Sequence, residues 1–355
     1  MISTEVRTGA QSYPVLIGLG LLAAAGDRIK ERLRPSRCVT ICDTNVGPRF
    51  AVALQNSLRA AGFEPALITV PAGEQAKTLE QAGEICEQML GNGLDRQSFV
   101  IGLGGGVIGD LSGFVAAIFE RGVPHVQMPT TLLAMVDSSI GGKTGVNARA
   151  GKNLIGAIHQ PVLVIDDVDV LRTLPPRELH QGFAEIVKHA IIADAEMFRE
   201  LQDVDLAKID FAPLVRRNVE IKARIIAHDE RDEKGERALL NFGHTIGHGI
   251  ERAVNYDIPH GEAVSLGIVA ACEVSVRKAG LPESDRDAIV DLLKKFQLLT
   301  KLPRNFPREK ILDALRFDKK FERGEIRFVV ASGIGSAHLS RDVTMEDIRA
   351  TVDAL

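Results

Sequence analysis

Short apolar runs alternate with amphipathic segments over the first 125 residues. Runs rich in β-branched residues occur at 15–17, 38–42, 66–70 and 99–103, and the segments between the last three have apolar residues at helical spacing. This order predicts βαβ crossovers and a largely parallel sheet. Ligands of such sheets bind at the carboxyl ends of the strands. The residues found there include four polar ones and a glycine: Asp43, Asn45, Glu74, Lys77 and Gly73.

A glycine-rich stretch follows the fourth run and precedes a helical segment. It satisfies G-x-G-x-x-G, a pattern in which backbone amides can contact a pyrophosphate. No acidic residue follows at the interval of about 20 positions that a Rossmann ribose contact uses, so Asp43 could contact the ribose instead. The alternative is a tight turn without a ligand. The stretch comprises Gly104, Gly105, Gly106, Val107, Ile108, Gly109 and Asp110.

Hydroxyl groups, glycines and lysines gather between residues 127 and 153. Glycine allows close backbone approach and lysine supplies charge-assisted donors, so the segment predicts a site for phosphate and hydroxyl groups. It is not a P-loop, because no glycine stands five residues before Gly142. The alternative for each lysine is a solvated surface position. The residues concerned are Thr130, Thr131, Asp137, Lys143, Lys152 and Asn153.

The pattern changes at residues 171–178, where we place a domain boundary. From Arg177 onward nearly every apolar run has helical period, with proline or glycine between the runs. Two short segments, 325–330 and 335–339, are the exception and predict a pair of strands. The second half is therefore expected to be mostly α-helical.

Polar residues cluster in the second half at 241–260. If 241–251 is one helix, Asn241, His244, His248 and Glu251 fall within an arc of roughly 80°. His260 follows a proline and starts the next apolar run, where the loop can fold it back towards the other histidines. Two imidazoles suit Zn²⁺ if a carboxylate or thiolate joins them. The alternative is that these histidines cap helices or fill the core.

The missing ligand is expected on the first helix of the second half. Glu185 and Lys188 are three residues apart in an otherwise apolar segment, so they share one helix face. Glu185 could be the third metal ligand, with Lys188 as its partner cation. His189 could be the ligand instead, and a simple ion pair is the remaining alternative.

Composition narrows the class of protein. At 355 residues the chain suggests two domains, and with 45% apolar residues, 25% charged residues and a net charge of −4 it lacks the basic field that nucleic acid requires. Residues 1–7 do not resemble a signal peptide, and no apolar run suits a membrane span, so we expect a cytoplasmic protein. The four cysteines form no CxxC pair, so any metal is expected to have nitrogen and oxygen ligands.

A series of motifs resembles the 3-dehydroquinate synthase family over essentially the whole chain. The motifs lie at 71–77, 104–110, 129–134, 137–143, 151–153, 184–188, 241–248 and 260–262. The resemblance implies a Rossmann-like nucleotide-binding α/β domain at residues 1–175 and a mostly α-helical metal- and substrate-binding domain at 176–355. It also implies bound NAD⁺, one Zn²⁺ with Co²⁺ as a substitute, and a homodimer.

Carried over position by position, the resemblance implies three groups of residues. The metal ligands would be Glu185, His244 and His260. The NAD⁺ contacts would be Asp43, Asn45, Gly73, Glu74, Lys77, Gly105, Gly106, Val107, Ile108, Gly109, Asp110, Thr130, Thr131, Lys143 and Lys152. Substrate binding and catalysis would involve Lys152, Asn153, Arg121, Asp137, Lys188, Lys222, Arg237, Asn241, His248 and Lys319, with Lys320 as the alternative to Lys319.

The resemblance further implies a reaction on a small anionic sugar-acid phosphate. The family is a phosphate-eliminating lyase of the shikimate pathway, in aromatic amino acid biosynthesis, that converts 3-deoxy-arabino-heptulosonate 7-phosphate to 3-dehydroquinate. The steps are transient oxidation by NAD⁺, phosphate elimination, re-reduction, ring opening and aldol closure. NAD⁺ is therefore a catalyst that is regenerated in each turnover.

Three other functions compete with this interpretation. A metal-dependent alcohol or polyol-phosphate dehydrogenase shares the two-domain plan, but it would not need Lys143, Lys152, Asn153 and Arg237 together. A cyclase for another sugar phosphate is closer, although Lys152, Asn153 and Asp137 favour a substrate with a carboxylate. An NAD-binding regulator with structural zinc would need four protein ligands, and the sequence offers three.

Overall fold

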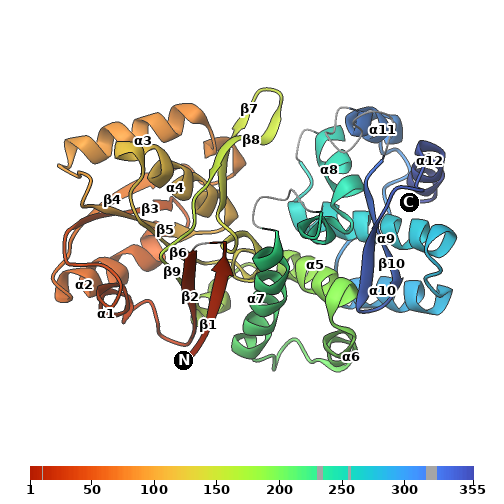
Figure 1. Cartoon of the computed structure of the whole chain (residues 1–355), viewed down its shortest axis with the longest axis horizontal. Coiled ribbons are helices and arrows are strands. Elements are labelled where there is room, and N and C mark those ends of the chain that lie inside the picture. The colour runs from red at the N-terminus through yellow and green to blue at the C-terminus, as the bar shows by residue number, and fades with distance from the viewer. Residues whose placement is uncertain (10, 230–234, 255–256, 317–325) are drawn as a thin grey trace. The chain divides into compact units, whose positions relative to one another are not determined.

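The chain folds into two compact units. The computed structural model describes residues 1–9, 11–229, 235–254, 257–316 and 326–355 (Figure 1). One unit comprises residues 1–175 and 210–231, and the other comprises 176–209 and 232–355. The sequence division into 1–175 and 176–355 stays a prediction about separately folding domains. By packing, residues 210–231 join the first unit.

A seven-stranded sheet forms the centre of the first unit, in the order β1-β2-β9-β6-β5-β3-β4. All neighbours are parallel except β1 and β2, which pair antiparallel. The prediction that the sheet is largely parallel is confirmed, whereas the antiparallel pairing of β1 and β2 was not predicted. The strands are β1 (Ile2–Thr8), β2 (Gln11–Gly18), β3 (Arg37–Asp43), β4 (Glu64–Val70), β5 (Phe99–Gly104), β6 (His125–Pro129) and β9 (Leu163–Asp167).

Helices cover both faces of this sheet (Figure 1). Ile29 and Leu54 pack on one face, and Ile85 and Leu111 pack on the other. Burial on both faces explains why β5 is apolar or glycine throughout instead of alternating. The helices of the unit are α1 (Ala25–Lys30), α2 (Val52–Ala60), α3 (Leu79–Gly91), α4 (Gly106–Ile118) and α7 (Phe211–His228).

Short turns and one hairpin complete the first unit. The hairpin consists of β7 (Lys143–Ala148) and β8 (Gly151–Ile158), and it extends away from the sheet (Figure 1). It carries three of the predicted site residues, Lys143, Lys152 and Asn153. The helical turns are η1 (Gly47–Ala51), η2 (Glu74–Ala76), η3 (Phe119–Arg121), η4 (Ala134–Ser138) and η5 (Val168–Thr173).

The second unit is mostly helical, as the sequence predicts. The predicted pair of strands is present as β10 (Phe328–Gly333) and β11 (Ser336–Ser340), which pair antiparallel. The helices are α5 (Pro176–Ala193), α6 (Ala195–Asp203), η6 (Arg237–Asn241), α8 (His244–Ala253), α9 (His260–Lys278), α10 (Glu283–Lys295), α11 (Arg308–Arg316) and α12 (Met345–Ala354). None of the helices that the structure describes has the length and apolar character of a bilayer-crossing segment.

Candidate active site

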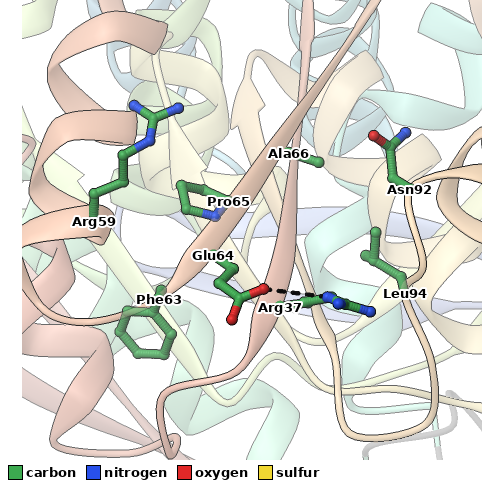
Figure 2. A pocket seen from close by; sticks show the side chains of 8 residues that line it. All are labelled: Arg37, Arg59, Phe63, Glu64, Pro65, Ala66, Asn92 and Leu94. Atoms are coloured by element: carbon green, nitrogen blue, oxygen red, sulfur yellow. Dashed lines mark hydrogen bonds and ion pairs between the residues drawn. The ribbon is translucent and has the colours of Figure 1, made fainter.

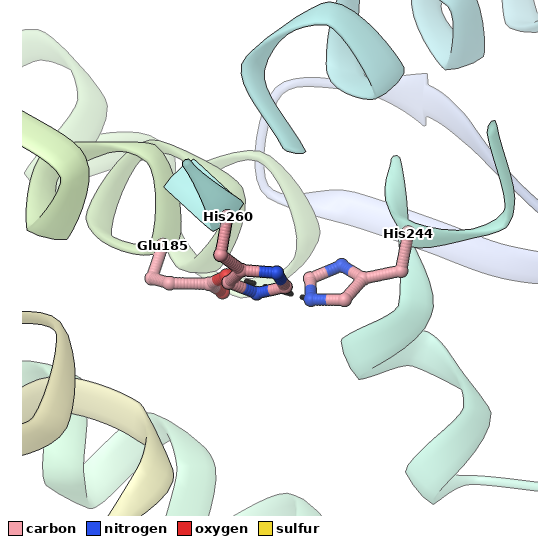
Figure 3. Close-up of side chains that lie close together, drawn as sticks. All are labelled: Glu185, His244 and His260. Carbon is pink, nitrogen blue, oxygen red and sulfur yellow. Dashed lines mark ion pairs between the residues drawn. The ribbon is translucent and has the colours of Figure 1, made fainter. Parts of the chain in front are cut away.

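Three side chains of the second unit converge on one point (Figure 3). Glu185 comes from the middle of α5, and His244 and His260 are the first residues of α8 and α9. Glu185 Oε1 lies 3.4 Å from His244 Nε2 and 3.5 Å from His260 Nε2. The structure therefore brings together the three residues that the sequence selected as metal ligands.

The spacing of these atoms fits one divalent cation. In a tetrahedral site with bonds of about 2.1 Å, neighbouring ligand atoms lie about 3.4 Å apart. Both distances from Glu185 Oε1 agree with that value. Both Glu185 oxygens are buried; Oε2 pairs with the Lys188 ammonium, and Oε1 has no hydrogen-bond partner in the described part of the chain, so a cation would supply a partner for Oε1. Three protein ligands leave a fourth position for water or substrate, as catalytic sites do.

Glycine packing explains why the two histidines meet. A Cβ atom at Gly267 of α9 would lie 1.9 Å from the carbonyl oxygen of Gly243, so only glycine allows α8 and α9 to approach this closely. Gly243 itself has φ +78° and ends the preceding turn. Helix α8 therefore starts at His244, and Asn241 lies on η6. The prediction that Asn241 shares one helix with His244 was wrong for this reason.

Nearby charges set the protonation of the three residues. Burial raises the pKa of Glu185, but the Lys188 ammonium and His244 outweigh it and hold that pKa well below its usual range. Burial is the main cause that lowers the pKa of His244, against the raising effect of Glu185. Burial also lowers the pKa of His260, but contacts with Glu185 and Glu251 dominate and raise it to about 10. Cation binding at neutral pH would therefore release a proton from His260.

Two more polar residues of α8 lie beside the histidines. Glu251 Oε1 is 3.4 Å from His260 Nδ1, and the His248 ring centroid is 5.4 Å from that of His244 and 6.1 Å from that of His260. His244, His248 and Glu251 thus share the helix face that the sequence predicted. The sequence interpretation gave Glu251 no role, although its spacing from His248 was a usable signal.

In the first unit, predicted cofactor residues follow the carboxyl ends of neighbouring strands. Asp43 ends β3, and its Oδ1 accepts hydrogen bonds from the amides of Asn45 and Val46. The glycine stretch joins β5 to α4, as the sequence predicts, with Gly105 at the N-cap and no side chain capping the helix. The first amides of α4 are therefore suited to an anion. The residues after β4 and β6 are Gly73, Glu74, Lys77, Thr130 and Thr131.

A hydrogen-bond network joins the 73–78 loop to the β7–β8 hairpin. Lys77 is 3% exposed, and its Nζ lies 2.5 Å from both Asp110 Oδ2 and Asn153 Oδ1. Asn147 Nδ2 donates to Glu74 Oε1 at 2.8 Å, and its Oδ1 accepts from the Asn153 amide at 3.0 Å. The sequence interpretation assigned no role to Asn147. Its position within the glycine- and lysine-rich segment was the available signal.

The remaining predicted residues of the first unit occupy three places. Lys222 of α7 pairs with the Asp137 carboxylate and donates to the Asp137 carbonyl at 2.7 Å, which links α7 to η4. Arg121 has φ +70° at the end of η3 and is exposed. Lys143 starts β7, and the half-buried Lys152 lies 3.9 Å from Glu74 through its Nζ.

The remaining predicted residues of the second unit are Lys188, Arg237, Asn241 and Lys319. Lys188 is 1% exposed and forms a salt bridge with Glu185, so the predicted pair forms beside the histidines. Arg237 is buried and Asn241 half-buried, at opposite ends of η6. Lys319 and its alternative Lys320 lie outside the described residues.

A separate cavity of about 410 Å³ lies at the amino ends of β3 and β4 (Figure 2). Arg37 and Glu64, the first residues of β3 and β4, line it with Phe63, Asn92 and Leu94. Asp43 lies at the opposite end of β3, and Gly73, Glu74 and Lys77 follow the opposite end of β4. The cavity is therefore not part of the candidate site.

Comparison with known proteins identifies the family of this chain. The family model for the 3-dehydroquinate synthase N-terminal region matches residues 67–181, and the C-terminal model matches residues 182–321. A curated 3-dehydroquinate synthase from Symbiobacterium thermophilum is 44% identical over 358 aligned positions, which cover 99% of each chain. The chain belongs to the 3-dehydroquinate synthase family. It is therefore an enzyme of this family, and the resemblance seen in the motifs is confirmed.

Solved structures of sugar phosphate cyclases have the same fold. The 2-epi-5-epi-valiolone synthase from Streptomyces hygroscopicus, solved with NAD⁺ and Zn²⁺ bound, has a TM-score of 0.88 and 29% identity over 98% of both chains. A 2-deoxy-scyllo-inosose synthase has a TM-score of 0.90 over 99% of both chains, and at 24% identity it shows the fold alone. Both support the predicted fold class of an α/β unit with a helical unit.

Proposed function

We propose that the protein is a 3-dehydroquinate synthase that converts 3-deoxy-arabino-heptulosonate 7-phosphate to 3-dehydroquinate and phosphate. The observation that carries the proposal is the convergence of Glu185, His244 and His260 in a chain of this family. The identity of 41–44% to curated 3-dehydroquinate synthases over nearly the whole chain also supports it.

Glu185, His244 and His260 would hold the divalent cation, Zn²⁺ or Co²⁺. When bound, the cation would stabilise negative charge on a substrate oxygen. Lys188 would keep Glu185 ionised through their salt bridge, so that the carboxylate stays a ligand. His248 is half-buried beside both ligand histidines, and its ring would move a proton at a substrate oxygen.

NAD⁺ would bind along the residues after β3, β4, β5 and β6. When bound, it would supply a reversible hydride acceptor, as the chemistry needs. The uncapped start of α4 would hold its pyrophosphate, in agreement with the glycines there. Lys77 is hydrogen-bonded to Asp110, and Glu74 accepts a hydrogen bond from Asn147 of the hairpin, so these side chains already have fixed positions.

Lys152, Asn153, Arg121, Lys222 and Arg237 would bind the anionic ends of the substrate. Asn153 uses its Oδ1 to accept from Lys77, and this orients its Nδ2 group as a donor to a substrate oxygen. Asp137 keeps Lys222 in place through its carboxylate and carbonyl oxygens. Such positioning can supply several kcal/mol of the rate enhancement.

A second candidate is a cyclase for a different sugar phosphate. The fold and 29% identity shared with 2-epi-5-epi-valiolone synthase favour it over a dehydrogenase. The higher identity to curated 3-dehydroquinate synthases favours the first proposal. A sugar phosphate of similar size without the carboxylate separates the two, because only the second candidate should turn it over readily.

One incubation tests the proposed reaction. The protein is mixed with the heptulosonate phosphate, substoichiometric NAD⁺ and zinc, and phosphate and NADH are measured together. We expect one phosphate per substrate consumed and no accumulation of NADH, because the hydride returns to the product. NADH that rises in step with product would identify a dehydrogenase and overturn the proposal.

Substitution of a proposed metal ligand tests whether the reaction needs the cation. Glu185→Gln keeps the size of the side chain but removes the charge that the cation and Lys188 share. We expect it to lose most bound zinc and phosphate release while its circular dichroism stays native. If the protein still released phosphate after complete removal of metal, the reaction would not require the cation.

A further inference from the structure

Glu251 faces the outer nitrogen of a candidate metal ligand. It lies on α8, two turns after His244, and is 2% exposed. Its Oε1 is 3.4 Å from His260 Nδ1, while His260 Nε2 is 3.5 Å from Glu185 Oε1. The two nitrogens of this ring therefore face two different carboxylates, one in the candidate metal site and one behind it.

His244 shows the same arrangement with a different partner. Its Nδ1 lies 3.2 Å from the carbonyl oxygen of Phe242, and its Nε2 lies 3.4 Å from Glu185 Oε1. In both histidines an oxygen atom of the protein contacts Nδ1, and Nε2 is directed at Glu185. Ligand histidines in metalloproteins commonly donate the second N–H to a carboxylate or a backbone carbonyl in this way.

We propose that Glu251 is a positioning residue of the metal site, which accepts the Nδ1–H of His260 and so presents Nε2 to the cation. The inference rests on the proposed function, because it assumes that Glu185, His244 and His260 bind the metal. It adds a residue to which neither the family motifs nor the comparisons assign a role.

His260 needs such a partner more than His244 does. Its side chain is 33% exposed, against 10% for His244, so packing restrains its ring less. It is also the first residue of α9, directly after Pro259. An imidazole ring can rotate by about 180° around its last side-chain bond at low cost, which exchanges the two edges of the ring. A carboxylate at Nδ1 selects one orientation and one tautomer, and it makes Nε2 a stronger donor to the metal.

The main competing role for Glu251 is that of a ligand. Ligand atoms of His248, Glu251 and His260 also lie within 4.8 Å of one another, so these residues could bind a second cation. In that case removal of Glu251 would abolish one binding equivalent instead of weakening the first. Stoichiometry therefore separates the two roles.

The test compares Zn²⁺ affinity and Co²⁺ spectra among four full-length proteins: wild type, Glu251→Ala, Glu251→Gln and Glu273→Gln. Glu273 is the matched control, because it is a carboxylate on α9 that pairs with Arg286 and lies away from the histidines. Zinc affinity is measured by competition with a chelator, and the visible absorption of the cobalt protein reports on its ligand set. Circular dichroism without metal checks the fold of each variant.

We expect Glu251→Ala to bind zinc about 10- to 100-fold more weakly than wild type. Its cobalt spectrum should change, because His260 is no longer held in the ligand set. Glu251→Gln should lose less affinity than Glu251→Ala, since its amide oxygen can still accept from Nδ1. Glu273→Gln should match wild type in affinity and spectrum. If Glu251→Ala does not fold, a weakened affinity and an altered cobalt spectrum in Glu251→Gln would support the role.

Three results would overturn the inference. Affinities and spectra of both Glu251 variants that match wild type would show that the carboxylate does not position His260. Two zinc equivalents in wild type and one in Glu251→Ala would make Glu251 a ligand. A wild-type protein that binds no zinc would refute the metal assignment itself, and that failure is distinct from the first two.

Discussion

The first unit contains a histidine that burial keeps neutral. The rings of His125 and His159 stack with centroids 4.9 Å apart, and neither ring nitrogen of His125 has a hydrogen-bond partner in the described part of the chain. Burial, with a smaller contribution from His159, lowers the pKa of His125 to about 3. A charged His125 is therefore incompatible with the folded first unit at moderate acidity.

This residue should make the first unit sensitive to acid. The unfolded chain takes up a proton near pH 6.5, and the native ring does so only near pH 3, so stability is lost as the pH falls between these values. At pH 5 the loss is about 2 kcal/mol relative to pH 7. His125→Phe keeps a ring against His159 but cannot titrate. In urea unfolding with a chelator present, its stability difference between pH 7 and pH 5 should be smaller by about that amount.

A surface histidine provides the control for this measurement. His338 of β11 is exposed, so His338→Gln should leave the pH dependence at its wild-type value. An unchanged pH dependence in His125→Phe would show that another group causes the acid sensitivity.

Asp166 should act in the opposite direction. It is fully buried on β9, no described residue makes a hydrogen bond to its carboxyl oxygens, and burial raises its pKa well above the usual value. The unfolded chain ionises above about pH 4 and the native carboxyl does not, so stability falls by up to about 1.4 kcal/mol per pH unit as the pH rises. Asp166→Asn should remove this loss. The urea midpoints of wild type and Asp166→Asn at pH 5 and pH 8 test this. If the midpoint changed equally with pH in both proteins, the result would contradict the prediction.

At the scale of elements, the sequence predicted what depends on regular periodicity. The β3–α2–β4–α3–β5 order and the glycine turn before α4 are present because alternation and strand-to-helix spacing are local patterns. The sequence pattern did not predict the break between η6 and α8, because the spacing of apolar residues does not indicate that Gly243 has a φ of +78°. The packing of α7 with the first unit has no local signal in the sequence, since packing partners such as Lys222 and Asp137 are 85 residues apart in the chain.

Asn147 should connect cofactor binding to substrate binding. It joins Glu74 of the proposed NAD⁺ loop to Asn153 of the hairpin, while Lys77 bonds to Asn153 directly. Asn147→Ala removes two side-chain hydrogen bonds, each worth about 1 kcal/mol. We expect kcat/KM for the proposed substrate to fall roughly tenfold and NAD⁺ binding to weaken in the same variant, because both residue groups lose their support.

Calorimetric titration with NAD⁺ and steady-state kinetics measure the two effects. Asn56→Ala on α2, where the asparagine is exposed, is the matched control and should leave both unchanged. A loss of kcat/KM with wild-type NAD⁺ affinity would limit the role of Asn147 to the hairpin.

At the scale of the whole molecule, the metal ion and NAD⁺ are each proposed to bind residues of a single unit. All three proposed metal ligands lie in the unit of residues 176–209 and 232–355, and all proposed NAD⁺ contacts lie in the other. A ligand that binds only the native state stabilises the part that holds it, by about 2.7 kcal/mol at 100 times its Kd. Amides that exchange through unfolding of that part should then exchange up to about 100-fold more slowly.

Hydrogen exchange with zinc alone and with NAD⁺ alone should therefore protect different elements. Zinc should slow exchange in α5, α8 and α9, which carry Glu185, His244 and His260, and NAD⁺ should slow it in the 73–78 loop and the first turn of α4. In Glu185→Gln, zinc should no longer slow exchange and NAD⁺ should still do so, because Glu185 is a proposed ligand of the metal and not of NAD⁺. If zinc instead protected α4 while leaving α8 and α9 unchanged, the metal would bind in the first unit, and the three convergent side chains would need another explanation.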